Sequence, residues 1–312
     1  SDDLPTLGLP SMANFKSGEF WVHSPHRALA NISACYTEKP DPTTYMEDFL
    51  DLMKSGTGER GIVNREALQG LLPEGRDPNF DFGVNPCGEI ILRPQQFCNL
   101  SEVVVRPGMT IAQLKEAVKH AVLLGLVQST MTKFHFLSDE WRKNTEEEHL
   151  LGVSLTGQMD NPELLSEFNL TYLRSVARTY ANECADIMGI PRPAAVTCVK
   201  PSGTVSQLVG SASGLHPRHA PYYIRRVRVA ITDPVAKFLM AQGVPCHPEN
   251  GEAWETVKTV VFEFPLKSPA ESVCRDDVSA LDQLEWWLRL KTFWTDHNPS
   301  VTIHVHEDEW ID

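Results

Sequence analysis

Asn85-Pro86-Cys87-Gly88-Glu89 is the most informative stretch of the chain, and Cys98-Asn99-Leu100 follows it with the two cysteines eleven positions apart. In an extended or hairpin-tip backbone, residues i and i+2 project to the same side, so Asn85, Cys87 and Glu89 can face one ligand. Gly88 allows close approach of the backbone, and Pro86 stiffens the turn. The alternative is an ordinary turn with a buried cysteine and a surface glutamate, because cysteine is a common core residue.

A second candidate site follows a β-branched run, Val196-Thr197-Cys198-Val199. The run leads into Lys200-Pro201-Ser202-Gly203 and then Thr204-Val205-Ser206, which can open a short helix. Free backbone N–H groups at such a turn, together with hydroxyl groups, form an anion site. Taken alone, this segment is more often an ordinary turn.

Composition narrows the class of protein. With 312 residues and 42% hydrophobic content, the chain can bury a sizeable core. The net charge of −13 disfavours binding to polynucleotides, although basic residues cluster around Lys200 and Arg225 to Arg228 and can serve a single nucleotide. No run approaches the roughly 20 apolar residues of a membrane span, and no signal pattern is present, so we expect a cytoplasmic protein without membrane association.

Cysteine and histidine usage indicates neither disulfides nor a metal. The seven cysteines are an odd number without paired spacing, which favours a reducing compartment. His304 and His306 form a His-x-His pair, but with no third ligand in sight a polar strand face is the better interpretation. We therefore expect no metal site formed by side chains.

Hydrophobic periodicity predicts an α/β architecture in which helices cover parallel strands. Helical stripes lie at 43–54, 110–125, 173–188 and about 279–295. The second begins at a capping box of Thr110 and Gln113, and the third places Cys184 on its core face. Strand patterns lie at 103–105, 194–199, 223–229, 257–264 and 301–306. Because Ser1 is not an initiator Met and the last strand pattern stops just before the sequence does, we expect a fragment of a longer chain.

The motifs resemble those of adenosylcobalamin-dependent (class II) ribonucleotide reductases, and most closely the monomeric ribonucleoside-triphosphate type. Residues 85–100 are similar to the finger loop of that family. Further family-like segments lie in the expected order: Arg27 to Ala34, Ser55 to Arg65, Lys200 to Ser206, Gly214 to Pro217 and Tyr222 to Arg226. The resemblance covers roughly residues 21–310.

The resemblance implies a role for each matching residue. Cys87 would carry a thiyl radical generated from adenosylcobalamin and would take the hydrogen from C3′ of the ribose. Glu89 would accept the proton of the 3′-hydroxyl, Asn85 would bind the ribose hydroxyls, and Cys98 would be one of two thiols that reduce the sugar. Pro201, Ser202, Gly203, Thr204, Val205 and Ser206 would bind the substrate phosphates. The product would be deoxyribonucleotides for DNA synthesis.

The resemblance also implies a fold and partners. Residues 1–312 would form part of a ten-stranded α/β barrel, with the finger loop (residues 84–100) through its centre and a phosphate-binding turn at 200–206. The second reducing cysteine, the region that binds nucleotide effectors and the C-terminal shuttle cysteines would lie outside the chain, so the fragment alone would be inactive. The implied partners are a ribonucleotide and thioredoxin or a similar dithiol reductant.

Three alternatives remain open. The first is the catalytic subunit of an oxygen-dependent (class I) reductase, which shares the Cys-x-Glu loop. The second is a noncatalytic nucleotide-binding fragment, which would not need a thiol beside a carboxylate. The third is a thiol–disulfide protein using Cys87 and Cys98, which the lack of a Cys-x-x-Cys motif disfavours.

Overall fold

The computed structural model describes residues 16, 23–30, 32–55, 61–249 and 252–309. Most of the N-terminal stretch 1–17 lies outside these ranges, as do Asn31 and residues 56–60 of the Ser55 to Arg65 segment. Within the described part, no helix combines the length and the apolar character needed to cross a membrane.

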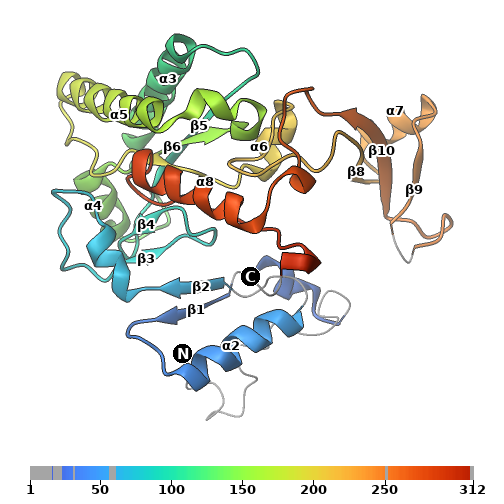
Figure 1. The fold of residues 1–312 in the computed structure, drawn as a ribbon, viewed down its shortest axis with the longest axis horizontal. Helices are drawn as coiled ribbons and strands as arrows, with labels where there is room; N and C mark the ends of the chain where they lie inside the picture. Colours follow the sequence, from blue (N-terminus) through green and yellow to red (C-terminus); the bar gives the residue numbers. More distant parts are fainter. Residues whose placement is uncertain (1–15, 17–22, 31, 56–60, 250–251, 310–312) are drawn as a thin grey trace.

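A parallel sheet forms the centre of the molecule (Figure 1). Its strands are β5 (Asn99–Val104), β6 (Leu151–Thr156) and β7 (Thr197–Cys198), in the order β5-β6-β7. Helices α3 (Ile111–Ser129), α5 (Glu167–Met188) and α8 (Ala280–Phe293) pack around it. The predicted α/β architecture with helix-covered parallel strands is confirmed for this part of the chain.

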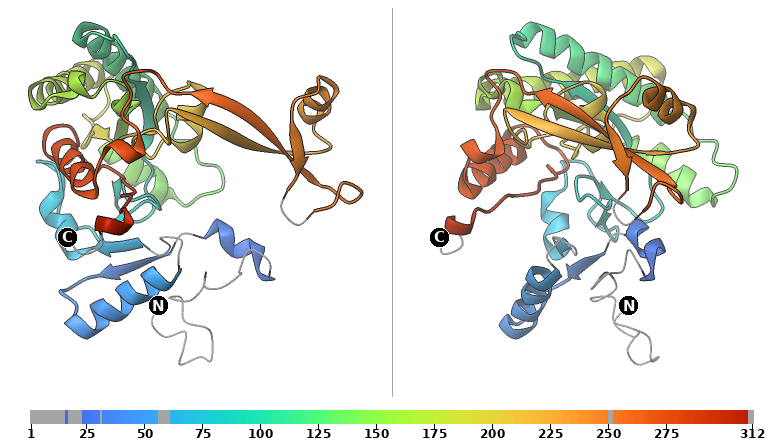
Figure 2. Two further views of the ribbon diagram at one scale, coloured as in Figure 1. Left: turned by 45° about the vertical axis from the view of Figure 1, so that its right-hand side comes forward. Right: turned by 90° about the vertical axis from the view of Figure 1, so that its right-hand side faces the viewer.

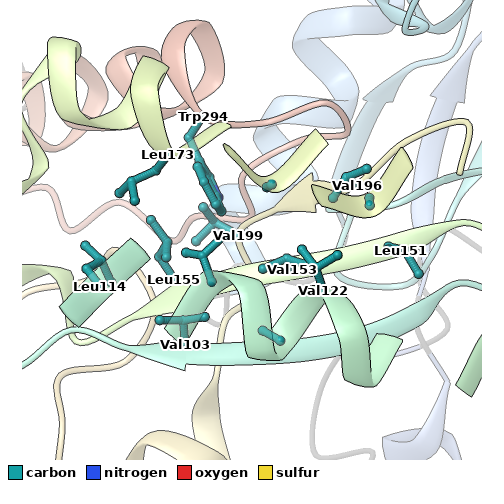
Figure 3. Close-up of a cluster of buried hydrophobic side chains, with 14 of the residues drawn as sticks. Val103, Leu114, Val122, Leu151, Val153, Leu155, Leu173, Val196, Val199 and Trp294 are labelled. Carbon is teal, nitrogen blue, oxygen red and sulfur yellow. The ribbon is translucent and has the colours of Figure 1, made fainter. Parts of the chain in front are cut away.

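The main hydrophobic core lies between this sheet and its helices. Side chains alternate between the two faces of a strand, so the odd-numbered residues of β5 and β6 enter the core. Figure 3 shows this cluster, which contains Val103 and Val153 from the sheet, Leu114 from α3, Leu173 from α5 and Trp294 just after α8. The even-numbered residues therefore face the opposite side of the sheet.

The finger loop lies against this opposite side as a short antiparallel hairpin. Strands β3 (Gly83–Val84) and β4 (Ile91–Leu92) pair with Val84 opposite Ile91, and residues 85–90 form the tip. Of the two backbones considered for Cys87, extended or hairpin tip, the structure has the hairpin tip. Helix α4 (Asp139–Glu148) and the 3-10 helix η4 (Glu66–Leu71) lie near its base.

Two peripheral units flank the centre (Figures 1 and 2). The first contains η3 (Pro25–Leu29), the parallel strands β1 (Ser33–Tyr36) and β2 (Gly61–Asn64), and α2 (Pro42–Ser55). The second projects outward and is an antiparallel sheet of β8 (Tyr222–Ala230), β10 (Thr259–Lys267) and β9 (Cys246–Pro248) with α7 (Pro234–Ala241). Shorter elements complete the described part: η5 (Gln158–Asp160), η6 (Pro162–Leu165), α6 (Gly203–Leu208), η7 (Arg275–Asp277) and η8 (Glu307–Glu309).

The predicted helices are all present. The capping box of Thr110 and Gln113 is formed, and α3 continues four residues beyond the predicted end. Helix α5 ends at Met188, the predicted end of its stripe, and is capped by a left-handed Gly189 (φ 67°). Cys184 is buried as predicted, whereas Ile187, placed on the same apolar face, is 86% exposed.

The strand predictions were less accurate. The strands at 223–229 and 257–264 exist, but they pair antiparallel with each other. The strand predicted at 301–306 is wrong. The backbone N–H groups of Thr302, His304 and His306 donate to side chains of other residues, so this segment has no strand partner in the described part.

Candidate active site

The tip of the finger loop is closed by its own hydrogen bonds. Asn85 N–H donates to Ile90 O (3.1 Å), and Ile90 N–H donates to the Asn85 Oδ1 (2.9 Å). Gly88 N–H donates to Asn85 O (2.9 Å), and Gly88 has φ 76°, a conformation that favours glycine. The Asn85 side-chain oxygen therefore already has a partner within the loop, while its Nδ2 group makes no hydrogen bond to any described residue.

Cys87 lies exposed at this tip. Partial burial raises the pKa of its thiol, the negative charge of Glu89 raises it further, and Lys200 opposes both effects. The thiol therefore keeps its hydrogen at neutral pH. A protonated thiol suits hydrogen-atom transfer, whereas a nucleophilic cysteine needs a lowered pKa.

Glu89 is buried beside Cys87, with only 1% of its surface exposed. Its Oε1 lies 3.9 Å from Lys200 Nζ, and its Oε2 has no hydrogen-bond partner among the described residues. A buried carboxylate oxygen without a partner is costly, so this oxygen is a candidate acceptor for a hydroxyl group or another donor. The Lys200 ammonium group offsets part of that cost.

The even-numbered face of the central sheet forms a wall beside the loop. Glu102, Ser154 and Cys198 are register partners on β5, β6 and β7, so their side chains share this face. Burial raises the pKa of Glu102, while contacts with Ser202 and Lys200 lower it. Gly152 lies on the same face, where an added Cβ atom would lie 2.4 Å from Leu100 Cδ2 and 3.2 Å from Cys198 Sγ.

Cys98 lies just before β5. Burial raises the pKa of its thiol. The charge of Glu89 raises this pKa further, whereas the charges of Arg76 and Lys200 lower it. Cys198, interpreted from the sequence as core, is fully buried. Burial raises the pKa of its thiol, and the neighbouring Cys98 and Glu89 raise it further. Two thiols and a carboxylate thus lie close to the loop tip that carries Cys87.

The turn at 200–206 connects β7 to this group. Lys200 N–H donates to Ser154 Oγ (2.9 Å), which ties the start of the turn to β6. Ser202 has a left-handed backbone (φ 56°) and is 5% exposed, and its Oγ makes no hydrogen bond of normal geometry with a described residue. Ser206 differs, because its hydroxyl is shared with Ser213 and with Gly203 O inside the fold.

A buried network of charged and polar groups supports the returning strand of the loop. Arg76 pairs with Glu148 through two contacts of 2.9 Å and donates to Ile91 O at 2.8 Å. Gln96 and Arg93 also contact the Glu148 carboxylate, at 2.6 Å and 3.0 Å. The sequence analysis missed this network, since its members are spread over 72 positions and share no motif.

The structure brings together Asn85, Cys87, Glu89 and Cys98, and it places the start of the 200–206 turn beside them. It divides the predicted basic group, because Lys200 lies against Glu89 and Arg225 contacts Gln207 of α6. Arg226 and Arg228 pair with Glu263 and Glu249 on the projecting sheet. Within the described residues, no group of three or more His, Cys, Asp or Glu side chains is arranged to hold a metal ion.

Comparisons with known proteins relate the chain to one group of enzymes. No protein-family model matches it. The adenosylcobalamin-dependent ribonucleoside-triphosphate reductase of Levilactobacillus brevis is 29% identical over 297 residues, covering 82% of this chain and 38% of that relative. The protein of the same name from Lacticaseibacillus paracasei is 28% identical over 326 residues, covering 91% of this chain and 42% of the relative. The chain thus spans 38–42% of the length of these relatives.

Solved structures show the same fold. A B12-dependent class II ribonucleotide reductase matches with a TM-score of 0.59 at 22% identity, over 71% of this chain and 35% of that one. The class Id ribonucleotide reductase α subunit of Actinobacillus ureae matches with a TM-score of 0.59 at 16% identity, over 93% of this chain and 58% of that one. The chain is therefore a homologue of the adenosylcobalamin-dependent ribonucleoside-triphosphate reductases and has the α/β fold of ribonucleotide reductases.

Proposed function

We propose that the protein to which this chain belongs reduces ribonucleotides to 2′-deoxyribonucleotides for DNA synthesis. The observation that carries the proposal is the pairing of Cys87 with Glu89 on one hairpin tip. The thiol keeps its hydrogen, and the neighbouring buried carboxylate has one oxygen without a partner. A binding module has no need for this combination, because binding alone requires no thiol beside a carboxylate.

Cys87 and Glu89 would act on adjacent groups of one ribose. The Cys87 thiyl radical takes the hydrogen atom from C3′ and becomes a thiol, leaving a carbon radical on the sugar. Glu89 accepts the proton of the 3′-hydroxyl, as a carboxylate within hydrogen-bond reach can do. The Asn85 Nδ2 group donates to a ribose hydroxyl and orients the sugar.

Cys98 would supply part of the reducing power. The 2′-hydroxyl leaves as water, and Cys98 with a second thiol outside this chain gives two electrons and two protons, ending as a disulfide. Cys87 then returns its hydrogen to C3′ and becomes a thiyl radical again. Thioredoxin or a similar dithiol protein would reduce the disulfide for the next cycle.

The turn from Pro201 to Ser206 would bind the substrate phosphates. The Ser202 hydroxyl, which lies near the Glu102 carboxyl, and the N–H groups at the start of α6 are suitable donors. Thr204 and Val205 lie at the exposed start of this helix, whereas Ser206 contributes to the shape of the turn through its bonds to Ser213 and Gly203. The names of the relatives favour a triphosphate.

Adenosylcobalamin would be the cofactor. The chemistry that it supplies when bound is a carbon-centred radical able to take the hydrogen atom of a thiol. Cys87 fits this role, because its side chain is exposed at the loop tip and its raised pKa retains that hydrogen.

Residues 1–312 would form one part of a larger catalytic barrel. Effector nucleotides, the second reducing thiol and the C-terminal shuttle cysteines would use regions outside this chain, so we expect no turnover by the chain alone. Its cysteines are all free, which suits a reducing cytoplasm.

A class I reductase is the second candidate, because the class Id α subunit matches this fold with an equal TM-score. The curated relatives favour the cobalamin type. Assays of the full-length protein with and without adenosylcobalamin separate the two: activity that needs a second radical-generating subunit and no cobalamin would establish class I.

Replacement of Cys87 by serine in the full-length protein tests the proposed chemistry. We expect chromatography to detect no deoxyribonucleotide from Cys87→Ser. The reason is that the serine oxygen cannot replace the thiyl radical at this position. Cys35→Ser is the matched control, since Cys35 is exposed on β1 and has no assigned role. Undiminished product from Cys87→Ser would refute the proposal.

A further inference from the structure

The segment at 295–300 runs along β7 and reaches the finger loop. Asp296 and His297 N–H groups both donate to Thr197 O (3.0 Å), and Ser300 N–H donates to Val199 O (2.9 Å). Val199 N–H in turn donates to Asn298 O (3.3 Å). The segment is therefore fixed to the strand that leads into Lys200.

Asn298 makes two hydrogen bonds to the loop tip. Its backbone N–H donates to Glu89 O at 3.0 Å, and its Nδ2 donates to Gly88 O at 3.0 Å. These carbonyls belong to the two residues that directly follow Cys87. One residue, 210 positions away in the sequence, thus holds two consecutive peptide units, the one between Gly88 and Glu89 and the one between Glu89 and Ile90.

We propose that Asn298 is a positioning residue that fixes the Cys87 thiol relative to the Glu89 carboxylate. The peptide bond is planar, so fixing the Gly88 and Glu89 carbonyls fixes the orientation of both peptide planes. The direction of the Cα–Cβ bond of Glu89 follows from those two planes, and the neighbouring plane between Cys87 and Gly88 is held by the Gly88 N–H bond to Asn85 O. Gly88 needs such external support, because glycine has the widest choice of backbone conformations.

The anchor behind Asn298 is strong enough for this task. Asp296 is 4% exposed, and its Oδ1 pairs with Arg174 and Arg178 of α5 at 2.9 Å and 2.8 Å. Its Oδ2 accepts from Val196 N–H at 3.0 Å. Fully buried His297 donates from Nε2 to Leu151 O at 3.0 Å. A site held by packed elements is more precise than one held by a loop alone.

Lys200 adds a second link of the same kind. It follows Val199, which pairs with the Asn298 segment, and its ammonium group lies 3.9 Å from Glu89 Oε1. The backbone of Glu89 is thus held by Asn298, and its side chain is held by Lys200. Both restraints lie at the end of β7: Lys200 follows this strand, and Asn298 belongs to the segment that pairs with Val199.

Asn298→Ala and Asn298→Asp in the full-length protein test the inference by amide hydrogen exchange of residues 83–92. We expect exchange of this hairpin to rise about tenfold or more in both variants, because the loop opens locally more often when the Nδ2 bond to Gly88 O is lost. Aspartate keeps the shape of asparagine but loses the Nδ2 donor. A residue that only fills space would be replaced by aspartate without effect.

Kinetics give the second readout, and only this readout rests on the proposed function. Misplacement of reacting groups by about 1 Å can lower a rate about a hundredfold. We therefore expect kcat to fall about tenfold to a hundredfold while KM changes less than about threefold, since the phosphate turn is intact. A protonated aspartate can donate to Gly88 O, so Asn298→Asp should recover activity relative to the wild type as the pH is lowered.

Asn169→Ala is the matched control, because Asn169 Nδ2 also donates to a backbone carbonyl, that of Leu164 at 2.9 Å, near the start of α5. It should leave both hairpin exchange and kcat at wild-type values. If Asn298→Ala folds poorly, Asn298→Asp carries the test. Unchanged hairpin exchange in the Asn298 variants overturns the inference. A wild-type protein that makes no deoxyribonucleotide overturns the proposed function instead, and leaves the exchange result to decide the role of Asn298.

Discussion

The Glu148 carboxylate offers a direct test of what holds the finger loop in place. It accepts from Arg76 Nε and Nη2, both at 2.9 Å, and from Gln96 Nε2 at 2.6 Å, and it pairs with Arg93 Nη2 at 3.0 Å. The side chains of Arg76 and Glu148 are 0% and 4% exposed. Arg76 also donates to Ile91 O on β4. The Glu148 carboxylate therefore positions the Arg76 guanidinium, which in turn holds the loop.

Glu148→Ala should lower the free energy of unfolding by about 3–5 kcal/mol, because it leaves the Arg76 guanidinium buried without its counter-charge. Glu148→Gln keeps the shape and one acceptor oxygen, so it should cost less, about 1.5–3 kcal/mol, the range for a hydrogen bond to a charged group. The double variant Arg76→Met/Glu148→Leu should cost less than the sum of the single changes, because no unpaired charge remains.

Urea unfolding of the full-length protein, followed by tryptophan fluorescence, measures these changes. Glu147→Ala is the control: this neighbouring carboxylate pairs with Arg93 at 2.7 Å but is 45% exposed, and we expect a loss of about 1 kcal/mol or less. Amide exchange of Ile91 and Leu92 should rise in Glu148→Ala and stay at the wild-type rate in Glu147→Ala. A Glu148→Ala protein within about 1 kcal/mol of the wild type would show that this reasoning about the buried pair is wrong.

Three further predictions concern the site. Glu89→Gln should lower kcat by about 10²- to 10⁴-fold with little change in nucleotide affinity, measured by steady-state assays and calorimetry, because the amide cannot accept the proton. Gly214→Ala should weaken triphosphate binding and lower the melting temperature, because Gly214 has φ 54° and an added Cβ atom would lie 2.4 Å from Lys200 O. Gly210→Ala is the control: Gly210 has φ 68° but open space around it, so the change should alter stability only. Burial lowers the pKa of His297 to about 4, below its unfolded value, so its contribution is complete above about pH 6.5 and is lost as the pH falls toward 4. The free energies of unfolding from urea titrations at pH 7 and pH 5 should differ by about 2 kcal/mol less in His297→Gln than in the wild type, and an equal acid loss in both would contradict the assignment.

Local sequence predicted the elements whose stabilising contacts are local. The helices at 43–54, 110–125, 173–188 and 279–295 were legible because a helix bonds within itself and shows its buried face every three to four residues. The hairpin tip around Cys87 was legible for a similar reason, since Gly88 and Asn85 close it within six residues. The amino-acid sequence of the loop also indicated the reductase fold that the comparisons show.

Strands were harder to predict because their partners are distant in the sequence. Strand β6 was missed although all six of its residues are buried, since a strand covered on both faces shows no alternation. The segment at 301–306 alternates correctly yet is not a strand, because its backbone N–H groups meet the side chains of His216, Gln283 and Glu309. An alternating pattern predicts two faces, but only the tertiary structure supplies a partner strand.

For the site, the sequence by itself determined which groups are present: the thiols of Cys87 and Cys98, the carboxylate of Glu89 and the amide of Asn85 all lie within one short segment. Only the tertiary structure decided that Lys200 lies against Glu89 and that Asn298 holds the two carbonyls after Cys87. The physical reason is that hydrogen bonds and ion pairs depend on distance in space. The chain brings residues separated by 210 positions within 3.0 Å only after helices and sheet have packed.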